Sequence, residues 1–245
     1  FAEAVESRIE AKPSVPGDEE GWLFLVRELR HLGLGKFWEK PWQEVAANRS
    51  DPVSSMVEFH GLLAERGIEL LVVPVPAKGR IYPEKVDSSF AVGDPDALSD
   101  FVNRLRERGL RVIDLESHFL EIRRKNAEAK LYCAQDAHYA PAAIEEIARI
   151  LHKEIGIETG QSAFSLSKES ELTIMGDQVS GSEWEGSLPR ETLTVRYVME
   201  NGEKGVSPNP ASPVLLLGDS HTLVLQAAEE KGMHSRGAEM LDHLS

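Results

Sequence analysis

The chain has little of several features that would each define a class of protein. Its 245 residues include a single cysteine, Cys133, which excludes an intrachain disulfide framework and a multi-cysteine metal site. No run of about 18 apolar residues occurs, so nothing in the sequence predicts a membrane span. Internal repeats, low-complexity tracts and a secretory signal are also absent. The remaining composition, 41% hydrophobic and 28% charged, is typical of a globular protein.

Positive charge is scarce as well. There are 27 Lys and Arg residues against 41 Asp and Glu, and the formal net charge is −14. Contacts to phosphates need clustered basic side chains, so the charge argues against a nucleic-acid partner. Basic residues gather within 104–111 and at Arg123 to Lys125. They alternate with acidic or apolar residues on predicted helices, and we interpret them as solvated helix faces.

Apolar strand patterns and amphipathic helix patterns alternate along the chain. Strands are predicted at 69–75, 111–115 and 213–217, and helices at 54–66, from a cap at Asp94-Pro95 to Gly109, and at 141–155. Continuous apolar strands separated by helices are typical of a parallel sheet covered by helices. The right-handed crossover rule then favours a doubly wound α/β sandwich, whose sites form at the carboxyl ends of strands.

The stretch from about 156 to 212 has a different character. It is rich in Ser, Gly and Thr, with one alternating strand pattern from Leu193 to Met199. We predict an insertion that forms a short antiparallel or irregular cover near the site. The aromatic residues of the first 50 positions, which we interpret as packing residues, are Trp22, Phe24, Trp38 and Trp42.

The predicted strand 213–217 ends in the turn Gly218-Asp-Ser-His221. A helix is predicted after this turn, to about Lys231. Ser220 would then lie between a strand and a helix, where free N–H groups and the helix dipole favour a developing negative charge. That is a good position for a nucleophilic hydroxyl. Serine is also a favoured helix N-cap, and this structural role is the alternative.

A second polar pair lies upstream, on a predicted strand-to-helix loop. Asp136 and His138 are two residues apart, and in extended backbone such residues point to the same side. The Asp136 carboxylate could accept a hydrogen bond from Nδ1 of His138 and fix the tautomer whose Nε2 takes a proton from a serine. The alternative is a surface loop with an isolated histidine. Together with the Ser220 turn, the pair favours catalysis.

Four segments resemble, in the same order, the alginate O-acetyltransferase family. These are bacterial envelope proteins with a circularly permuted SGNH-hydrolase-like domain. The segments are Gly21-Trp-Leu-Phe-Leu25, Pro74-Val-Pro-Ala-Lys-Gly-Arg-Ile-Tyr-Pro83, Asp136-Ala-His138 and Gly218-Asp-Ser-His221. The resemblance covers nearly the whole chain, from about Gly17 onward.

The resemblance implies an α/β fold of SGNH-hydrolase type: a three-layer sandwich with a mostly parallel sheet flanked by helices. It implies a Ser–His–Asp mechanism that uses no cofactor and no metal. Ser220 matches the nucleophile, His138 the general base and Asp136 the residue that orients the base. An acetyl group on Ser220 would pass to a sugar hydroxyl, or to water in an esterase.

Lys78 and Tyr82 match a Lys-x-x-x-Tyr-Pro element of the family, which we assign to the surround of the substrate site. A solvated loop lysine is the alternative for Lys78.

The resemblance also implies partners and a compartment. Membrane partner proteins would deliver the acetyl donor, and the acceptor would be an alginate-like polysaccharide of the periplasm. We expect one SGNH-hydrolase-like acetyltransferase domain over 1–245, with an insertion at about 156–212. Family members continue beyond the nucleophile helix, so we expect an incomplete C-terminus here, with oxyanion donors missing. A signal or anchor before Phe1 is expected to have been removed.

Two other classes of function remain open. A non-catalytic polysaccharide-binding or assembly subunit would bind glycan without turnover. A metal hydrolase would use Asp136, His138 and His221, although no metal motif of known spacing such as His-Glu-x-x-His is present. Residue types alone do not separate a transferase from an esterase, because that choice depends on how well the site excludes water.

Overall fold

The computed structural model describes residues 12–36, 38, 52–93, 97–156, 164–207, 209–225 and 235–244. It divides the chain into two compact units, Phe1–Ala129 and Lys130–Ser245. None of the helices in the described ranges is long and apolar enough to cross a membrane. The predicted cap at Asp94-Pro95 and Trp42 lie outside the described residues.

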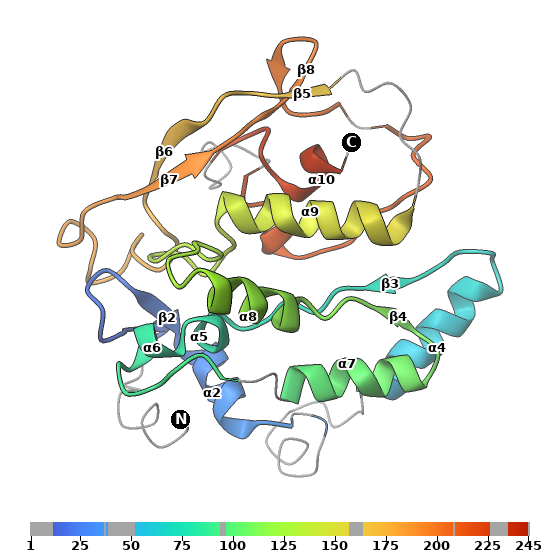
Figure 1. Ribbon diagram of the computed structural model, residues 1–245, viewed down its shortest axis with the longest axis horizontal. Helices are drawn as coiled ribbons and strands as arrows, with labels where there is room; N and C mark the ends of the chain where they lie inside the picture. Colours follow the sequence, from blue (N-terminus) through green and yellow to red (C-terminus); the bar gives the residue numbers. More distant parts are fainter. Residues whose placement is uncertain are drawn as a thin grey trace. The chain divides into compact units, whose positions relative to one another are not determined.

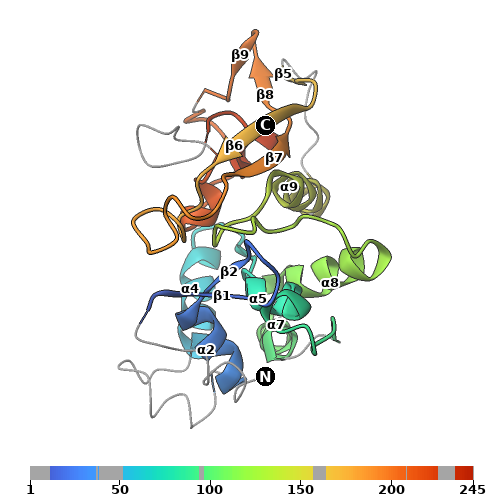
Figure 2. The same ribbon diagram turned by 90° about the vertical axis from the view of Figure 1, so that its left-hand side faces the viewer.

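The first unit consists of short strands and helices (Figure 1). They are β1 (Ser14–Pro16), β2 (Leu23–Leu25), α2 (Val26–Leu34), α4 (Pro52–Ala64), β3 (Leu71–Val72), α5 (Lys78–Ile81), α6 (Pro83–Val86), α7 (Ala97–Glu107), β4 (Arg111–Val112) and α8 (Leu115–Lys125). Strands β1 and β2 pair antiparallel, with Val15 opposite Phe24. Figure 2 shows this pair with α2 following it.

The core of this unit lies between α4, α7 and the parallel pair β3–β4. Leu71 is opposite Arg111 and Val72 opposite Val112. The helices contribute the buried side chains Val53, Phe101, Val102 and Leu105. The helix predicted at 54–66 is therefore confirmed, and so is the helix predicted from Asp94-Pro95 to Gly109 over its described residues. The burial follows from apolar residues that recur on one face of each helix.

The strands predicted at 69–75 and 111–115 are shorter than expected. Pro74 and Pro76 carry no backbone N–H, so the ladder does not continue beyond Val72 on that side. On the other strand, the Asp114 side chain accepts a hydrogen bond from Ser117 N at 3.0 Å and caps α8. Helix α8 therefore begins at Leu115, a residue that was predicted to belong to the strand.

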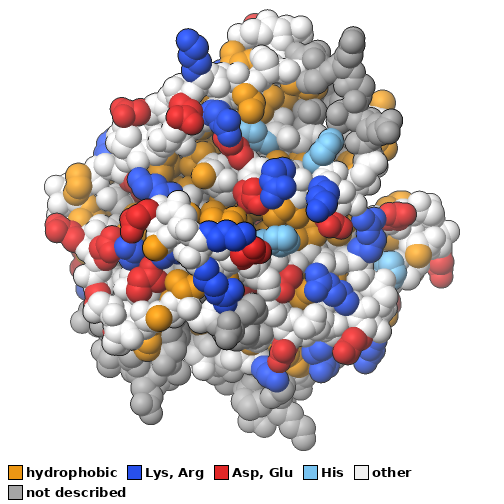
Figure 3. Space-filling model, in the orientation of Figure 1, with side chains coloured by type: hydrophobic (Ala, Val, Ile, Leu, Met, Phe, Trp, Pro, Cys, Tyr) orange, Lys and Arg blue, Asp and Glu red, His pale blue; other side chains and the backbone are white. Residues whose placement is uncertain are grey.

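The interpretation of Arg123 as part of a solvated helix face is wrong. Its side chain is buried, forms an ion pair with Glu84, and lies over the Tyr82 ring at 4.4 Å from the centroid. A buried guanidinium needs both a carboxylate partner and a surface that accepts its planar face, and α6 with Tyr82 supplies them. On the face shown in Figure 3, basic and acidic side chains are interspersed.

The second unit begins with a loop at 130–140 and then carries helices and antiparallel strands. Its elements are α9 (Pro141–Ile155), β5 (Phe164–Leu166), β6 (Ser170–Ile174), β7 (Glu191–Val195), β8 (Val198–Glu200), β9 (Glu203–Lys204), the 3₁₀ helix η1 (Ser220–Thr222) and α10 (Met240–His243). Helix α9 matches the predicted range. It begins at Pro141 and ends at Gly156, whose φ of 66° suits a left-handed C-cap.

The insertion predicted at about 156–212 contains antiparallel strands, as expected. Strands β6 and β7 pair over five residues each, and β8 pairs with both β5 and β9. The alternating pattern from Leu193 to Met199 is divided between β7 and β8. A small core of Cys133, Ala140, Ile174 and Leu193 joins the β6–β7 pair to the start of the unit.

The buried strand predicted at 213–217 is wrong. This segment belongs to no strand, and Leu215 and Leu217 are 80% and 75% exposed. A continuous apolar strand needs hydrogen-bonding neighbours and cover on both faces, whereas the described strands of this unit pair among themselves. In the described part of the helix predicted to Lys231, only η1 is helical, and residues 226–231 fall outside the described residues.

One strand pair, β3–β4, is parallel, and the other described pairs are antiparallel. The mostly parallel sheet is therefore not confirmed by the described strands.

A buried carboxylate near the end of the chain couples stability to pH. Glu239 precedes α10 and is 2% exposed, and its backbone N–H donates to Asp242 Oδ2 at 3.2 Å. Burial, with the like charge of Asp242 as a smaller cause, raises the pKa of Glu239 from 4.5 to about 7. The folded state thus holds this proton more tightly than the unfolded state. The stability that the protonated Glu239 carboxyl contributes to the fold is fully present below pH 4.5 and is lost as the pH rises through 7.

We therefore expect Glu239→Gln to stabilise the protein at pH 8, by about 1–3 kcal/mol, and to have little effect at pH 4.5. Gln keeps an oxygen that accepts the helix N–H groups but carries no charge. Thermal unfolding at the two pH values measures the effect. Glu203→Gln, at an exposed position of β9, is the matched control. Equal stability of wild type and Glu239→Gln at pH 8 would contradict the assignment.

Candidate active site

Asp136 and His138 lie in a loop that is closed by backbone hydrogen bonds. Tyr132 and Tyr139 form an isolated antiparallel bridge. Cys133 N donates to His138 O at 3.1 Å, and Ala140 N donates to Leu131 O at 3.0 Å. The two ends of the loop are thus held together just before α9 begins. The loop therefore presents its polar residues from a fixed base.

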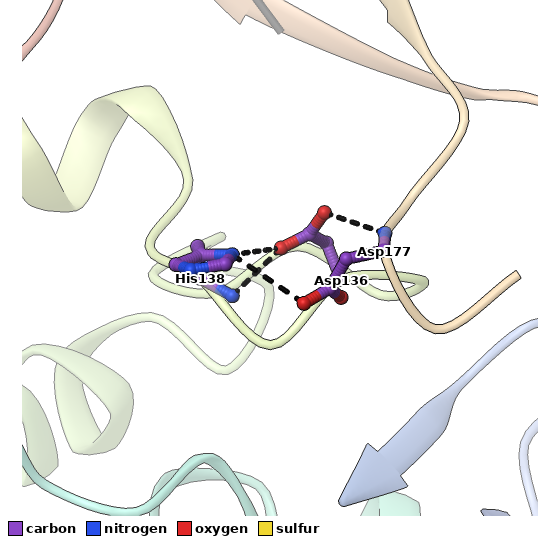
Figure 4. Close-up of side chains that lie close together, drawn as sticks. All are labelled: Asp136, His138 and Asp177. Carbon is purple, nitrogen blue, oxygen red and sulfur yellow. Dashed lines mark hydrogen bonds and ion pairs between the residues drawn. The ribbon is translucent and has the colours of Figure 1, made fainter. Parts of the chain in front are cut away.

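The Asp136 carboxylate is fully buried and uses both oxygens (Figure 4). Oδ1 accepts hydrogen bonds from the backbone N of His138 at 2.9 Å and from its ring Nδ1 at 2.5 Å. Oδ2 accepts from Asp177 N at 2.8 Å. The contact predicted from the i, i+2 spacing is present. An imidazole that donates from Nδ1 leaves Nε2 as its proton acceptor.

Asp177, which the sequence analysis did not single out, completes this arrangement. Its carboxylate accepts from Ala137 N at 2.9 Å and lies 3.7 Å from His138 Nδ1. The residue before it has to be glycine, since a Cβ on Gly176 would lie 2.0 Å from Gln135 O. The backbone at 176–178 therefore packs directly against the backbone of the loop of Asp136 and His138. Only the Gly-Asp pair could have signalled this contact in the sequence, and such pairs are common in turns.

Strand β7 supports the other side of the same loop. Glu191 accepts hydrogen bonds from Ala134 N at 2.8 Å and Gln135 N at 3.0 Å. The Gln135 side chain donates to Pro189 O at 2.8 Å. The insertion was predicted as a cover near the site. Its contacts with the loop are those of a scaffold that satisfies the backbone donors on which the position of Asp136 depends.

The turn that carries Ser220 is shaped by its neighbours. Asp219 caps η1, accepting from His221 N at 3.0 Å through its side chain and from Thr222 through its carbonyl. A Cβ on Gly218 would lie 2.3 Å from Thr222 Cγ2, so the close turn requires glycine.

Ser220 itself is exposed, and among the described residues its hydroxyl has no hydrogen-bond partner. The Ser220–His138 hydrogen bond of a triad is therefore not formed in this structure. Its catalytic assignment stays a prediction.

The His221 ring brings the Ser220 turn into contact with the ring of His138. Its ring centroid lies 5.0 Å from that of His138 and 4.5 Å from that of Tyr139. Tyr132 contacts the ring edge-on at 6.2 Å. In the sequence analysis His221 appeared only as a metal ligand in one hypothesis. In the structure it is the side chain that packs the turn against the loop of Asp136 and His138.

The two histidines have opposite electrostatic environments. Burial has the largest single effect on the pKa of His138 and lowers it. The hydrogen bond to Asp136 and the charges of Asp136, Asp177 and Asp219 outweigh burial, so the pKa of His138 is raised above 6.5. For His221, burial and the neighbouring His138 charge lower the pKa to about 4. His221 is therefore neutral at physiological pH, while His138 is poised to carry a proton.

Lys78 and Tyr82 lie in the first unit, whereas Asp136, His138 and Ser220 lie in the second. Lys78 is 1% exposed, which excludes a solvated loop lysine. Its Nζ donates to Leu23 O at 2.7 Å and lies over the rings of Trp22 and Phe24. Tyr82 is also buried, and its hydroxyl donates to Ala129 O at 2.7 Å. Their assignment to substrate binding stays a prediction.

The structure brings together three possible metal ligands, and they differ from the set predicted from the sequence, which included His221. Ligand atoms of Asp136, His138 and Asp177 lie within 4.8 Å of one another. The hydrogen bonds already described account for this closeness, because they occupy Nδ1 of His138 and both oxygens of Asp136. A cation would have to displace the Nδ1 hydrogen bond. The donor set therefore fits an oriented imidazole better than a metal ion.

Comparison with known proteins gives one family and several relatives. Residues 15–229 match the family described as "SGNH hydrolase-like domain, acetyltransferase AlgX". A curated relative, "Probable alginate O-acetylase AlgJ" of Pseudomonas aeruginosa PAO1, is 28% identical over 147 residues, which are 60% of this chain and 34% of the relative. This chain thus spans about a third of that protein.

Two solved structures are similar at 18% identity, each over 76% of this chain. The O-acetyltransferase domain of Pseudomonas putida AlgJ gives a TM-score of 0.54 and is covered over 65% of its length. Pseudomonas aeruginosa AlgX gives a TM-score of 0.53 and is covered over 43%. These likenesses support an SGNH-hydrolase-like fold for the chain. The family match extends over most of the sequence and includes both polar segments of the site, and we conclude that the chain belongs to the SGNH hydrolase-like domain family of acetyltransferase AlgX.

Proposed function

We propose that this protein is an O-acetyltransferase that acetylates hydroxyl groups of a polysaccharide through an acetyl-Ser220 intermediate. Family membership supports acetyl transfer as the class of reaction. The observation that carries the proposal is the buried Asp136 carboxylate at 2.5 Å from His138 Nδ1. It gives the imidazole one orientation and one tautomer, which general-base catalysis requires.

In the proposed reaction, Nε2 of His138 removes the proton from Ser220 Oγ as the oxygen attacks the acetyl carbonyl carbon. The carbon–oxygen bond to the donor's leaving group then breaks, and the leaving group takes the proton from His138. In the second half, His138 deprotonates a sugar hydroxyl, which attacks the acetyl carbon. The bond from that carbon to Ser220 Oγ then breaks, and Oγ takes the proton from His138. Asp136 stays ionised and stabilises the imidazolium in both halves.

The site also has to bring Ser220 to Nε2 of His138. In this structure the two groups are not hydrogen-bonded, and catalytic hydrogen bonds of unliganded sites often tighten only when substrate binds. The Ser220 turn is exposed and short, and its glycine and capping aspartate fix its internal shape. A movement that brings this turn to Nε2 of His138 is therefore what the proposal requires.

The names of the relatives support an alginate-like acceptor, and we include in the proposal a periplasmic location and an acetyl donor delivered by membrane partner proteins. Hydrolysis of the acetyl-enzyme by water would give an acetylesterase activity at the same site. The mostly parallel three-layer sandwich of SGNH hydrolases, and a single acetyltransferase domain, belong to the same proposal.

A non-catalytic polysaccharide-binding or assembly subunit is the second candidate. The observation in its favour is the Ser220 hydroxyl, which makes no hydrogen bond to His138. Against it stands the Asp136–His138 pair, because binding a glycan does not require an imidazole held in one tautomer. The two candidates predict different results for catalytic turnover: the enzyme transfers or releases acetyl groups, and the binding subunit does not.

Ser220→Ala is expected to abolish release of acetate from a small chromogenic acetyl ester, because the acetyl acceptor is removed. Intact-mass measurement should detect an acetyl adduct on the wild type and none on the variant. Ser170→Ala, at an exposed position of β6, is the matched control and should behave as wild type. Turnover that survives in Ser220→Ala would rule out the serine mechanism, and glycan binding without any turnover would favour the binding subunit.

Asp136→Asn is expected to lower the turnover number by about 10³–10⁴-fold while the protein stays folded. The amide still accepts the backbone hydrogen bonds but favours the wrong imidazole tautomer. Esterase kinetics and circular dichroism measure the two properties. Asp100→Asn, at an exposed position of α7, is the control. A loss of less than tenfold in a folded Asp136→Asn variant would remove Asp136 from the mechanism.

The rate of acylation should rise with pH as His138 loses its proton, with a midpoint above 6.5. The charged groups that set this midpoint are Asp136, Asp177 and Asp219, while His221 is neutral in this range. Asp177→Asn removes a charge that raises the pKa of His138, so its acid limb should move to lower pH. Glu171→Gln, exposed on β6, should leave the profile unchanged. An unmoved acid limb in Asp177→Asn would show that Asp177 does not act on the base.

A further inference from the structure

The side chain that follows the nucleophile is placed in an unusual way. His221 lies on η1 directly after Ser220, but its ring is partly buried while Ser220 is exposed. The ring lies among three aromatic rings, at centroid distances of 4.5 Å to Tyr139, 5.0 Å to His138 and 6.2 Å to Tyr132. Tyr132 and Tyr139 are themselves buried and 5.1 Å apart. His221 thus completes an aromatic cluster beside the catalytic base.

The Ser220 turn has few other attachments. Gly218, Asp219 and Ser220 are exposed, and the hydrogen bonds of Asp219 run within the turn itself. On the far side of η1, Val224 and Leu225 are buried, and Ala238 N donates to Leu225 O at 3.3 Å. At the nucleophile's own position, the contact that connects the turn to the loop of His138 is the His221 ring.

The polar chemistry of His221 does not resemble that of a proton carrier. Its Nδ1 is buried and has no hydrogen-bond partner among the described residues, whereas Nδ1 of His138 faces the Asp136 carboxylate. With a pKa of about 4 the ring stays neutral near pH 7. A cationic ring in this place would oppose the imidazolium that forms on His138 during each transfer step. An uncharged aromatic ring suits the position.

We propose that His221 is a positioning residue, whose ring packs against Tyr139 and His138 and holds the Ser220 turn beside the catalytic base. The inference rests on the proposed serine mechanism. It assigns the function of His221 to the shape of its ring rather than to its nitrogen atoms. A displacement of the nucleophile by about 1 Å can cost on the order of 100-fold in rate, so one packed ring can matter greatly.

Three substitutions separate shape from hydrogen bonding. His221→Phe keeps an aromatic ring and removes both nitrogens. His221→Asn removes the ring but keeps a polar group at the place of Nδ1, and His221→Ala removes both. We expect His221→Phe to retain the wild-type turnover number within about threefold, with an unchanged acid limb in the pH profile. His221→Asn and His221→Ala should lose at least tenfold in turnover number with little change in KM, because binding is retained and alignment is lost.

The measurements are acetyl-ester kinetics across pH and the rate at which phenylmethanesulfonyl fluoride labels Ser220, read by intact mass. His152→Ala, at an exposed position of α9, controls for the loss of a histidine. Circular dichroism and thermal unfolding establish that each variant is folded, and if His221→Ala is unfolded, His221→Asn against His221→Phe carries the comparison.

If His221→Asn retained the wild-type turnover number and His221→Phe did not, the inference would be overturned and His221 would be a hydrogen-bonding residue. Equal loss in Phe, Asn and Ala would also overturn it. Both outcomes leave the proposed function standing if Ser220→Ala is inactive. No turnover and no Ser220 labelling in the wild type would instead overturn the proposed function, and the positioning role with it.

Discussion

The hydrogen bond between the buried Asp136 carboxylate and His138 is the interaction on which the site depends. A carboxylate removed from water is stable only if its oxygens are satisfied, and here His138 and Asp177 N satisfy them. The same bonds fix the ring of His138 and support its positive form. The same hydrogen bonds therefore stabilise the loop and orient the imidazole for proton transfer. A substitution that weakens these bonds will affect both properties.

The segment that contains the antiparallel strands β6 and β7 contributes directly to this arrangement. Glu191 on β7 accepts hydrogen bonds from the backbone N–H groups of Ala134 and Gln135, and Asp177 in the β6–β7 connection accepts one from Ala137 N. Gly176 allows the two backbones to approach to a distance that no other residue permits. What looks in the sequence like an irregular segment thus fixes the loop of Asp136 and His138. Of these two carboxylates, Asp177 also lies where its charge favours the imidazolium of His138.

The sequence predicted those features of the structure that depend on residues close together in the chain. Helix α9 follows from Pro141, its apolar face and Gly156, and the Asp136–His138 contact follows from a two-residue spacing. Long-range contacts were not predictable in this way. Asp177 is 41 residues from Asp136 along the chain, and no periodicity marks it.

The apolar run 213–217 has the pattern of a buried strand but has no strand neighbour among the described residues. Hydrophobicity indicates that a segment prefers burial, but it does not identify the strand with which the segment would pair. Arg123 was misjudged for a related reason, since its carboxylate partner lies on α6.

The single cysteine lies at the start of the loop of Asp136 and His138. Cys133 is buried, its backbone N–H donates to His138 O, and its Sγ lies 3.7 Å from Tyr139 O. A thiol reagent can reach this sulfur only when the structure around it opens, so the rate of alkylation measures local opening around this loop. The protein thus carries a native probe of motion next to His138, which needs no added label.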